Sequence, residues 1–313
     1  MRDPDVMGSS TWNVGLLAPL MARAPAFVRV PLDAFQCFLA ADGWAIASYI
    51  ALAVLMSLFP FLILINAIAA AIGSRDLGDE AGRLLLGAWP REVAAPIAGD
   101  LRQVQTAAQS GTVTISALFA VYFASNGIES LRIGLNRAYD AVETRSWWLL
   151  RLESILYVLV SAISLLVVAV FVVLGPLLVA TAVRYVHWLE PLDRLGTFAR
   201  LAVAAGILVV ALVLLHMWLP AGRRRVRQIF PGVAVTIALW LIGGASFGLY
   251  LAQYANRYVT TYAGLASAMI ALVFLYLSAA IFIYGGELNA AILRARRERA
   301  AAKAAPKVRT GTR

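Results

Sequence analysis

Residues 43–72 read GWAIASYIALAVLMSLFPFLILINAIAAAI, and this stretch decides the fold class of the chain. It contains no Asp, Glu, Lys or Arg, and it is longer than the roughly 20 apolar residues that carry a helix across a bilayer. A membrane-spanning strand would need only about half that length, and a backbone in lipid must satisfy its own hydrogen bonds. The stretch therefore predicts a transmembrane α-helix.

Five further windows without charged residues follow along the chain. With the first, they predict spans near residues 43–72, 112–131, 152–180, 199–219, 230–254 and 265–288. Hydrophobic residues make up 61% of the sequence and charged residues 14%, whereas about 25% of a soluble domain is charged. We expect an all-α polytopic membrane protein, a bundle of six transmembrane helices.

The distribution of positive charge sets the expected orientation. Placing both termini in the cytoplasm puts most of the 27 Lys and Arg residues on the cytoplasmic side, as the positive-inside rule requires. The chain then divides into an N-terminal cytoplasmic tail at 1–30, a transmembrane domain at 31–293 and a basic cytoplasmic tail at 294–313. This topology accounts for the net charge of +10 without a nucleic acid as partner.

A stripe of polar residues lies at the C-terminal end of the second predicted span. Glu129, Arg132 and Asn136 recur at helical spacing, so they share one helix face. Charges at membrane depth usually face a bundle interior or a watery cavity, which predicts a substrate cavity open to the cytoplasm. The alternative is a helix end that leaves the bilayer, with Glu129 and Arg132 paired to each other.

Glu287 and Asn289 close the last predicted span, on the same cytoplasmic side. Glu287 is then placed to meet the stripe of Glu129 and Arg132 in one cavity. The alternative is an interfacial glutamate paired with Arg294 or a neighbouring loop. A shared cavity would favour transport, whereas closed ion pairs would favour a structural role.

Glycines and a proline lie inside the predicted spans. Pro60 removes a backbone donor inside the first span and predicts a helix kink, which we interpret as a packing device rather than a gate. Gly244 and Gly248 form a GxxxG match, which indicates close helix contact within or between chains.

Residues that carry common enzyme chemistry are few. Cys37 is the one cysteine, and the two histidines, His187 and His216, lie far apart and outside any known ligand motif. We expect no metal site, no cofactor and no catalytic residue.

Short motifs accompany these windows in a fixed order: ADGW at 41–44, SLFP at 57–60, NG at 126–127, LNRAYD at 135–140, FPG at 230–232, YAG at 262–264, YLS at 276–278 and GGELN at 285–289. Over roughly residues 31–293 the chain resembles the YihY/BrkB family of bacterial inner-membrane proteins. The resemblance implies a six-span bundle of unsettled biochemical role, often suspected of transport. Some members carry the label ribonuclease BN, but RNA hydrolysis needs a metal cage or a positioned acid–base pair. The sequence supplies neither, so we expect no ribonuclease activity.

Three functions compete on the sequence. The leading hypothesis is a transporter or flippase-like protein for an amphiphilic or anionic envelope compound, with Glu129, Arg132, Asn136, Glu287 and Asn289 at the cavity. The second is a scaffold that holds a partner or organises lipid without transport, and the third is a membrane-bound enzyme, which we consider the weakest. The expected partners are membrane lipid and, as an open alternative, a second copy of the chain.

Overall fold

The structure is a computed structural model, and it describes residues 25–87, 89–91, 93–95, 98, 113–185, 205–222, 224–262 and 265–304. Helices dominate these residues, and no strand occurs among them. The helices are α2 (Ala26–Ala40), α3 (Gly43–Ala71), α4 (Arg75–Gly87), α6 (Val113–Ala138), α7 (Trp147–Tyr185), α9 (Val226–Tyr262) and α10 (Ala266–Ala304), with a further helix at Ala205–Trp218.

Four stretches of these helices are long and apolar enough to cross a membrane: Gly43–Ala71, Trp147–Val170, Val226–Tyr254 and Ala266–Ala301. They confirm the all-helical membrane fold at the first, third, fifth and sixth predicted spans. The second predicted span overlaps α6, which carries Glu129 and Arg132 in its second half, and the fourth overlaps the shorter helix Ala205–Trp218. The number of six spans therefore stays a prediction.

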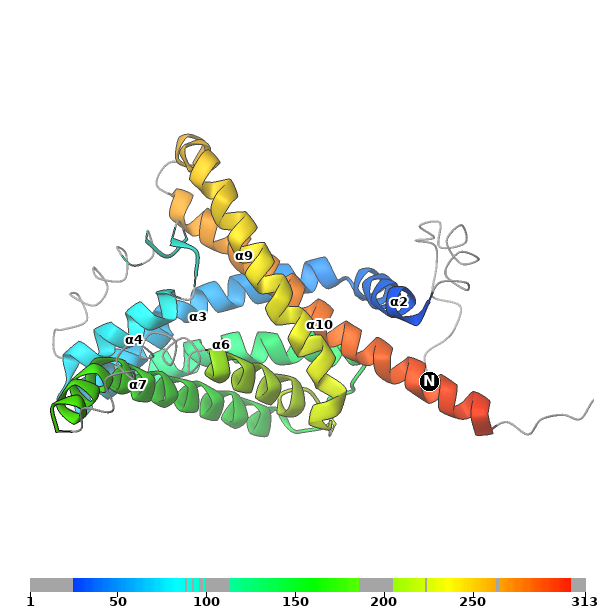
Figure 1. Ribbon diagram of the computed structural model, residues 1–313, viewed down its shortest axis with the longest axis horizontal. Coiled ribbons are helices and arrows are strands. Elements are labelled where there is room, and N and C mark those ends of the chain that lie inside the picture. Colours follow the sequence, from blue (N-terminus) through cyan, green and yellow to red (C-terminus); the bar gives the residue numbers. More distant parts are fainter. Residues whose placement is uncertain are drawn as a thin grey trace, which may run out of the picture.

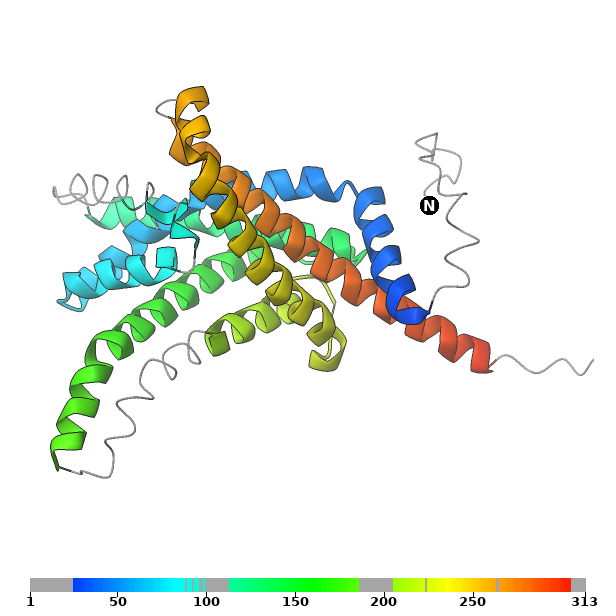
Figure 2. The same cartoon turned by 45° about the horizontal axis from the view of Figure 1, so that its top comes forward.

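Helix α10 lies at the centre of the molecule (Figures 1 and 2). It packs against α9, α3, α2 and α6. Helix α3 also packs against α6 and α4, and α6 in turn packs against α7. The C-terminal end of α10 projects past the other helices in both views. It continues to Ala304, well into the predicted basic tail, and α2 begins at Ala26 inside the predicted N-terminal tail.

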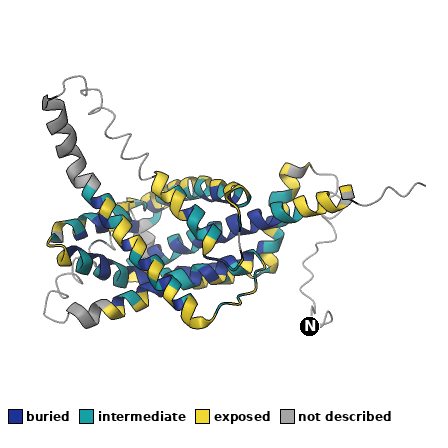
Figure 3. Cartoon of the chain, turned by 90° about the horizontal axis from the view of Figure 1, so that it is seen from below, coloured by how far each residue is buried: buried dark blue, intermediate teal, exposed yellow. Residues whose placement is uncertain are grey.

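Apolar side chains fill the interior and also cover much of the outside. Leu62, Ile65 and Leu135 are fully buried between the helices, and Figure 3 shows buried residues along the inner helix faces. Many large apolar side chains of α7 are exposed instead: Trp147, Trp148, Leu149, Leu152, Leu156, Val160, Ile163 and Val167. An exposed apolar face on a helix of spanning length is suited to contact with lipid.

A close helix crossing brings α9 and α10 together at Gly232 and Gly285. A Cβ atom at Gly232 would overlap the Gly285 carbonyl oxygen and the Asn289 side chain, and one at Gly285 would overlap the Thr236 hydroxyl. The Gly232 N–H donates to Asn289 Oδ1 over 2.7 Å. Small residues let two backbones approach in this way. By contrast, no neighbouring atom of the described residues lies within 4 Å of a Cβ built on Gly244, so Gly244 makes no such close contact with the part of the chain that the structure describes.

Pro60 lies inside α3, which continues through it without interruption from Gly43 to Ala71. The predicted kink, and its use as packing device or gate, stay predictions. One turn earlier, the Ser57 hydroxyl lies 2.6 Å from the Ala53 carbonyl and 3.2 Å from the Phe123 carbonyl. A polar group at this depth therefore joins α3 to α6.

Candidate functional site

The polar stripe on α6 pairs mainly with α7. Glu129 lies 2.8 Å from Arg151 and 3.6 Å from Arg132, so its carboxylate bridges two arginines. Arg132 also donates to the Leu150 carbonyl (2.9 Å) and the Ser154 hydroxyl (3.0 Å). Both arginines are buried. Buried charges are retained when they are paired and hydrogen-bonded, and these are.

Arg151 lies at the centre of this network, although in the sequence it contributes only to the positive charge of a predicted cytoplasmic segment. One of its terminal nitrogens donates to Asn126 Oδ1 and to Glu129, both at 2.8 Å, and the other donates to the Tyr122 carbonyl. Its guanidinium also lies over the Tyr122 ring, 3.8 Å from the centroid. These contacts fix the start of α7 against α6.

A second network surrounds the connection between α6 and α7. Arg145 forms bidentate hydrogen bonds with Glu143, both at 2.8 Å, and a 2.7 Å ion pair with Glu153 of α7. The Arg145 guanidinium lowers the pKa of the Glu143 carboxyl from 4.5 to about 2, because its hydrogen bonds favour the charged form. Asn136 joins the same network, since it donates to Glu143 and accepts from the Ala221 N–H at 2.7 Å.

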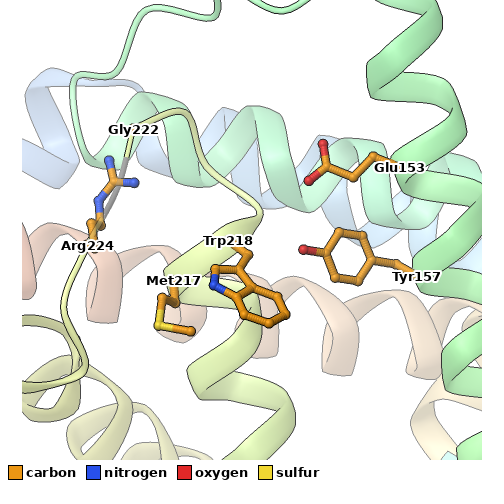
Figure 4. Close-up of a pocket in the computed structure, with 6 residues that line it drawn as sticks. All are labelled: Glu153, Tyr157, Met217, Trp218, Gly222 and Arg224. Carbon is orange, nitrogen blue, oxygen red and sulfur yellow. The ribbon is translucent and has the colours of Figure 1, made fainter.

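Next to this network lies a cavity of about 540 Å³. Figure 4 shows its lining from three parts of the chain: α7, the end of the helix Ala205–Trp218, and the turn that leads to α9. The lining side chains combine a cation, an acid and large apolar groups: Glu153, Tyr157, Met217, Trp218 and Arg224, with Gly222 between them. Gly222 has φ +88°, a left-handed conformation that glycine adopts without strain.

Arg224 is the unpaired charge of this cavity. No carboxylate of the described residues lies within 4 Å of it, and the neighbouring Glu153 is already paired with Arg145. Its guanidinium lies over the Tyr139 ring at 4.0 Å and donates to the Ala221 carbonyl. Burial lowers the pKa of Arg224, yet an arginine stays protonated in proteins. The cavity thus contains a positive charge that an anion would stabilise.

The five residues predicted to share a cavity lie in separate places. Glu129 and Arg132 belong to the α6–α7 network and Asn136 to the connection beside it. Asn289 bridges Gly232 and the Tyr139 hydroxyl. None of the five lines the cavity at Arg224, so their role in binding stays a prediction.

Glu287 is buried at 3% exposure on α10 and forms no ion pair with Arg132 or with any other described residue. The charged groups near it are Arg294, Asp140 and Asp33. The structure therefore does not bring Glu287 together with the stripe of Glu129 and Arg132, because α10 presents it toward α2 and the turn after α6.

Three buried polar atoms in the described residues lack a hydrogen-bond partner: Arg151 Nε, His216 Nε2 and Thr236 Oγ1. The His216 ring is held edge-on against Phe282 and Tyr139. Among the described residues no three His, Cys, Asp or Glu side chains gather as metal ligands would.

Comparison with known proteins places this architecture in a family. A family model described as virulence factor BrkB matches residues 34–309. The ribonuclease-like protein YfkH of Bacillus subtilis is 25% identical over 258 residues, which cover 82% of this chain and 93% of YfkH. The UPF0761 membrane protein PSHAa0171 of Pseudoalteromonas translucida is 22% identical over 254 residues, which cover 79% of this chain and 80% of the relative.

No solved structure shows a significant match. The family model covers most of the sequence, including the start of the basic tail, and the resemblance seen in the short motifs is confirmed. The chain is a membrane protein that belongs to the virulence factor BrkB family.

Proposed function

We propose that the protein is a six-span transporter of the bacterial inner membrane that moves an amphiphilic anion, with both termini in the cytoplasm. The observation that carries this proposal is the cavity at Arg224, where an arginine with no ion pair among the described residues lines the same cavity as large apolar side chains. An anionic headgroup would pair with Arg224, and an apolar tail would contact Trp218 and Met217.

The charges of the site favour an anion of this kind. Glu153 also lines the cavity, but its carboxylate is neutralised by Arg145 at 2.7 Å. Arginine presents a planar set of donors that matches carboxylate and phosphate groups. The site therefore selects negative charge and leaves room for one polar head, and the aromatic wall favours an amphiphile over a small ion.

In the proposed topology the cavity lies at the cytoplasmic membrane surface. The connection that contains Arg145 and the turn that contains Arg224 belong to the two cytoplasmic segments rich in arginine. Trp218 is more than half exposed at the end of its helix, a position that tryptophan favours at membrane surfaces. A substrate from the inner leaflet or the cytoplasm would reach the cavity directly.

Because Glu129 and Arg132 already form closed ion pairs, we assign the proposed binding role to Arg224 instead. These pairs connect α6 to α7 and so position the wall that carries Glu153 and Tyr157. A scaffold that does not transport is the alternative that such closed pairs favour. The two functions differ in whether Arg224 is needed for movement across the bilayer.

The test is a lipid-movement assay with the full chain in vesicles, using fluorescently labelled phosphatidylglycerol as the probe. We expect Arg224→Gln to slow movement roughly tenfold to a hundredfold, since a hydrogen bond to a charged group contributes about 1.5–3 kcal/mol. Arg225→Gln is the matched control, because it removes the same charge from an exposed residue that does not line the cavity. Arg224→Lys should restore part of the rate.

Equal rates in protein-containing and empty vesicles would contradict transport of this class of lipid. Equal loss in Arg224→Gln and Arg225→Gln would show that only surface charge matters. We also propose that the protein is not an enzyme, and RNA incubated with the same vesicles should stay intact. Release of fragments would instead extend to this chain the ribonuclease-like name that YfkH carries.

A further inference from the structure

A second pocket, of about 310 Å³, lies between α2 and the projecting end of α10. The two helices lie against each other there (Figure 2). The lining residues include three arginines and two acids: Arg29, Val30 and Asp33 from α2, and Arg294, Ala295, Glu298 and Arg299 from α10. The cavity at Arg224 shares none of these residues, so the two sites are separate.

The arginines of this pocket are unequally paired. Arg294 lies 3.9 Å from Asp33 and donates to Cys37 Sγ at 3.1 Å, so it attaches α2 to α10. Arg29 and Arg299 have no carboxylate of the described residues within 4 Å. Two cations at one pocket that have no ion pair among the described residues indicate an anionic ligand, and arginine pairs well with phosphate oxygens.

An apolar stripe runs along α2 beside the pocket. Val28, Leu32, Phe35 and Leu39 follow the spacing of one helix face, and all four are exposed. The helix is amphipathic, since Arg29, Asp33 and Gln36 share another face, while Ala34 and Phe38 are buried against the bundle. A helix with an exposed apolar face beside basic residues is suited to the surface of a membrane.

We propose that the pocket between α2 and α10 binds the headgroup phosphate of an anionic phospholipid, with its acyl chains along the exposed stripe of α2. Arg29 and Arg299 hold the phosphate from the two helices, while Arg294 keeps the helices together. The stripe favours a lipid over a soluble anion, because it places apolar surface next to the cations. The charge-free run of α10 ends at Gly286, so the pocket at Arg294 and Arg299 lies beyond the apolar part of the helix, on the side of the headgroups. This site does not depend on the proposed transport.

The test measures the binding of phosphatidylglycerol and of phosphatidylcholine to the purified full chain by native mass spectrometry. We expect phosphatidylglycerol to bind more tightly. An exposed ion pair between an arginine and a phosphate contributes up to about fivefold in binding, so Arg29→Gln/Arg299→Gln, which loses two such pairs, should weaken binding up to about twenty-five-fold. The control, Arg296→Gln/Arg297→Gln, removes the same charge from exposed positions of α10 that do not line the pocket, and it should bind like the wild type.

Several outcomes would overturn the proposal. Equal weakening in the two double variants would mean that net charge, rather than the pocket, attracts the lipid. Competition by inorganic phosphate alone, with no preference for phosphatidylglycerol, would identify a soluble anion as the ligand. Binding that appears only after residues 1–24 are deleted would mean that the chain's own segment occupies the pocket. Movement of labelled lipid in the vesicle assay should be unchanged in Arg29→Gln/Arg299→Gln, which separates this site from the one at Arg224.

Discussion

Replacing Gly232 by alanine tests the crossing of α9 and α10 directly. The new Cβ would overlap the Gly285 carbonyl oxygen, which is backbone and cannot rotate away, and the Asn289 side chain. Overpacking of this kind costs about 1–3 kcal/mol. The displaced Asn289 would also lose its 2.7 Å hydrogen bond from the Gly232 N–H, which adds about 1 kcal/mol.

The expected loss for Gly232→Ala is therefore about 2–4 kcal/mol, which corresponds to a fall of roughly 4–10 °C in apparent Tm. The assay is thermal unfolding of the purified protein in detergent, in which the fraction of protein that stays monodisperse is measured as the temperature rises. Gly244→Ala is the matched control on the same helix, because no atom of another described side chain or helix lies within 4 Å of its new Cβ. Alanine is the better helix former by about 1 kcal/mol, so this control should unfold at the same temperature or higher. Equal Tm values for both variants would refute the close crossing.

Two further predictions concern the ion networks. Arg151→Gln leaves Glu129 without its 2.8 Å partner and should cost on the order of 3 kcal/mol, measured as a loss of folded protein extracted from membranes. Arg137→Gln, whose side chain is exposed, should not change that yield, and a normal yield of Arg151→Gln would contradict the structural role. The pKa of Glu143 is lowered from 4.5 to about 2 by Arg145, so its stabilising effect is present above pH 4.5 and is lost as the pH falls toward 2. Thermal unfolding across that window should depend on pH less in Glu143→Gln than in the wild type, and equal pH dependence would argue against the pair.

The membrane fold could be predicted because it depends on composition alone. A run such as residues 43–72 excludes charge over a span length, and no knowledge of its neighbours is needed to recognise a helix in lipid. The second span stays a prediction, because α6 carries Glu129 and Arg132 within its polar half. Those charges are tolerated where Arg151 and Ser154 of α7 meet them.

The site could be predicted only in part. Helical spacing correctly placed Glu129 and Arg132 side by side on α6, but it does not say which neighbouring helix supplies their partners. Asn289 bonds a backbone group 57 residues earlier in the chain, and no local pattern indicates that contact. Arg224 belongs to a run of arginines that indicates topology, so its place in a cavity became visible only when α7 and the turn before α9 were positioned.

The central place of α10 has a consequence for biosynthesis. It leaves the ribosome after α2, α3, α6 and α9, yet it provides the surface on which these four helices pack. Until α10 is inserted, the Gly232 N–H and the Tyr139 hydroxyl lack their contacts with Asn289. Domains made N-terminal first can fold during synthesis, whereas the packing of these helices has to wait for α10. Chains truncated before α10 should therefore be recognised as unassembled and degraded, however well their earlier helices insert.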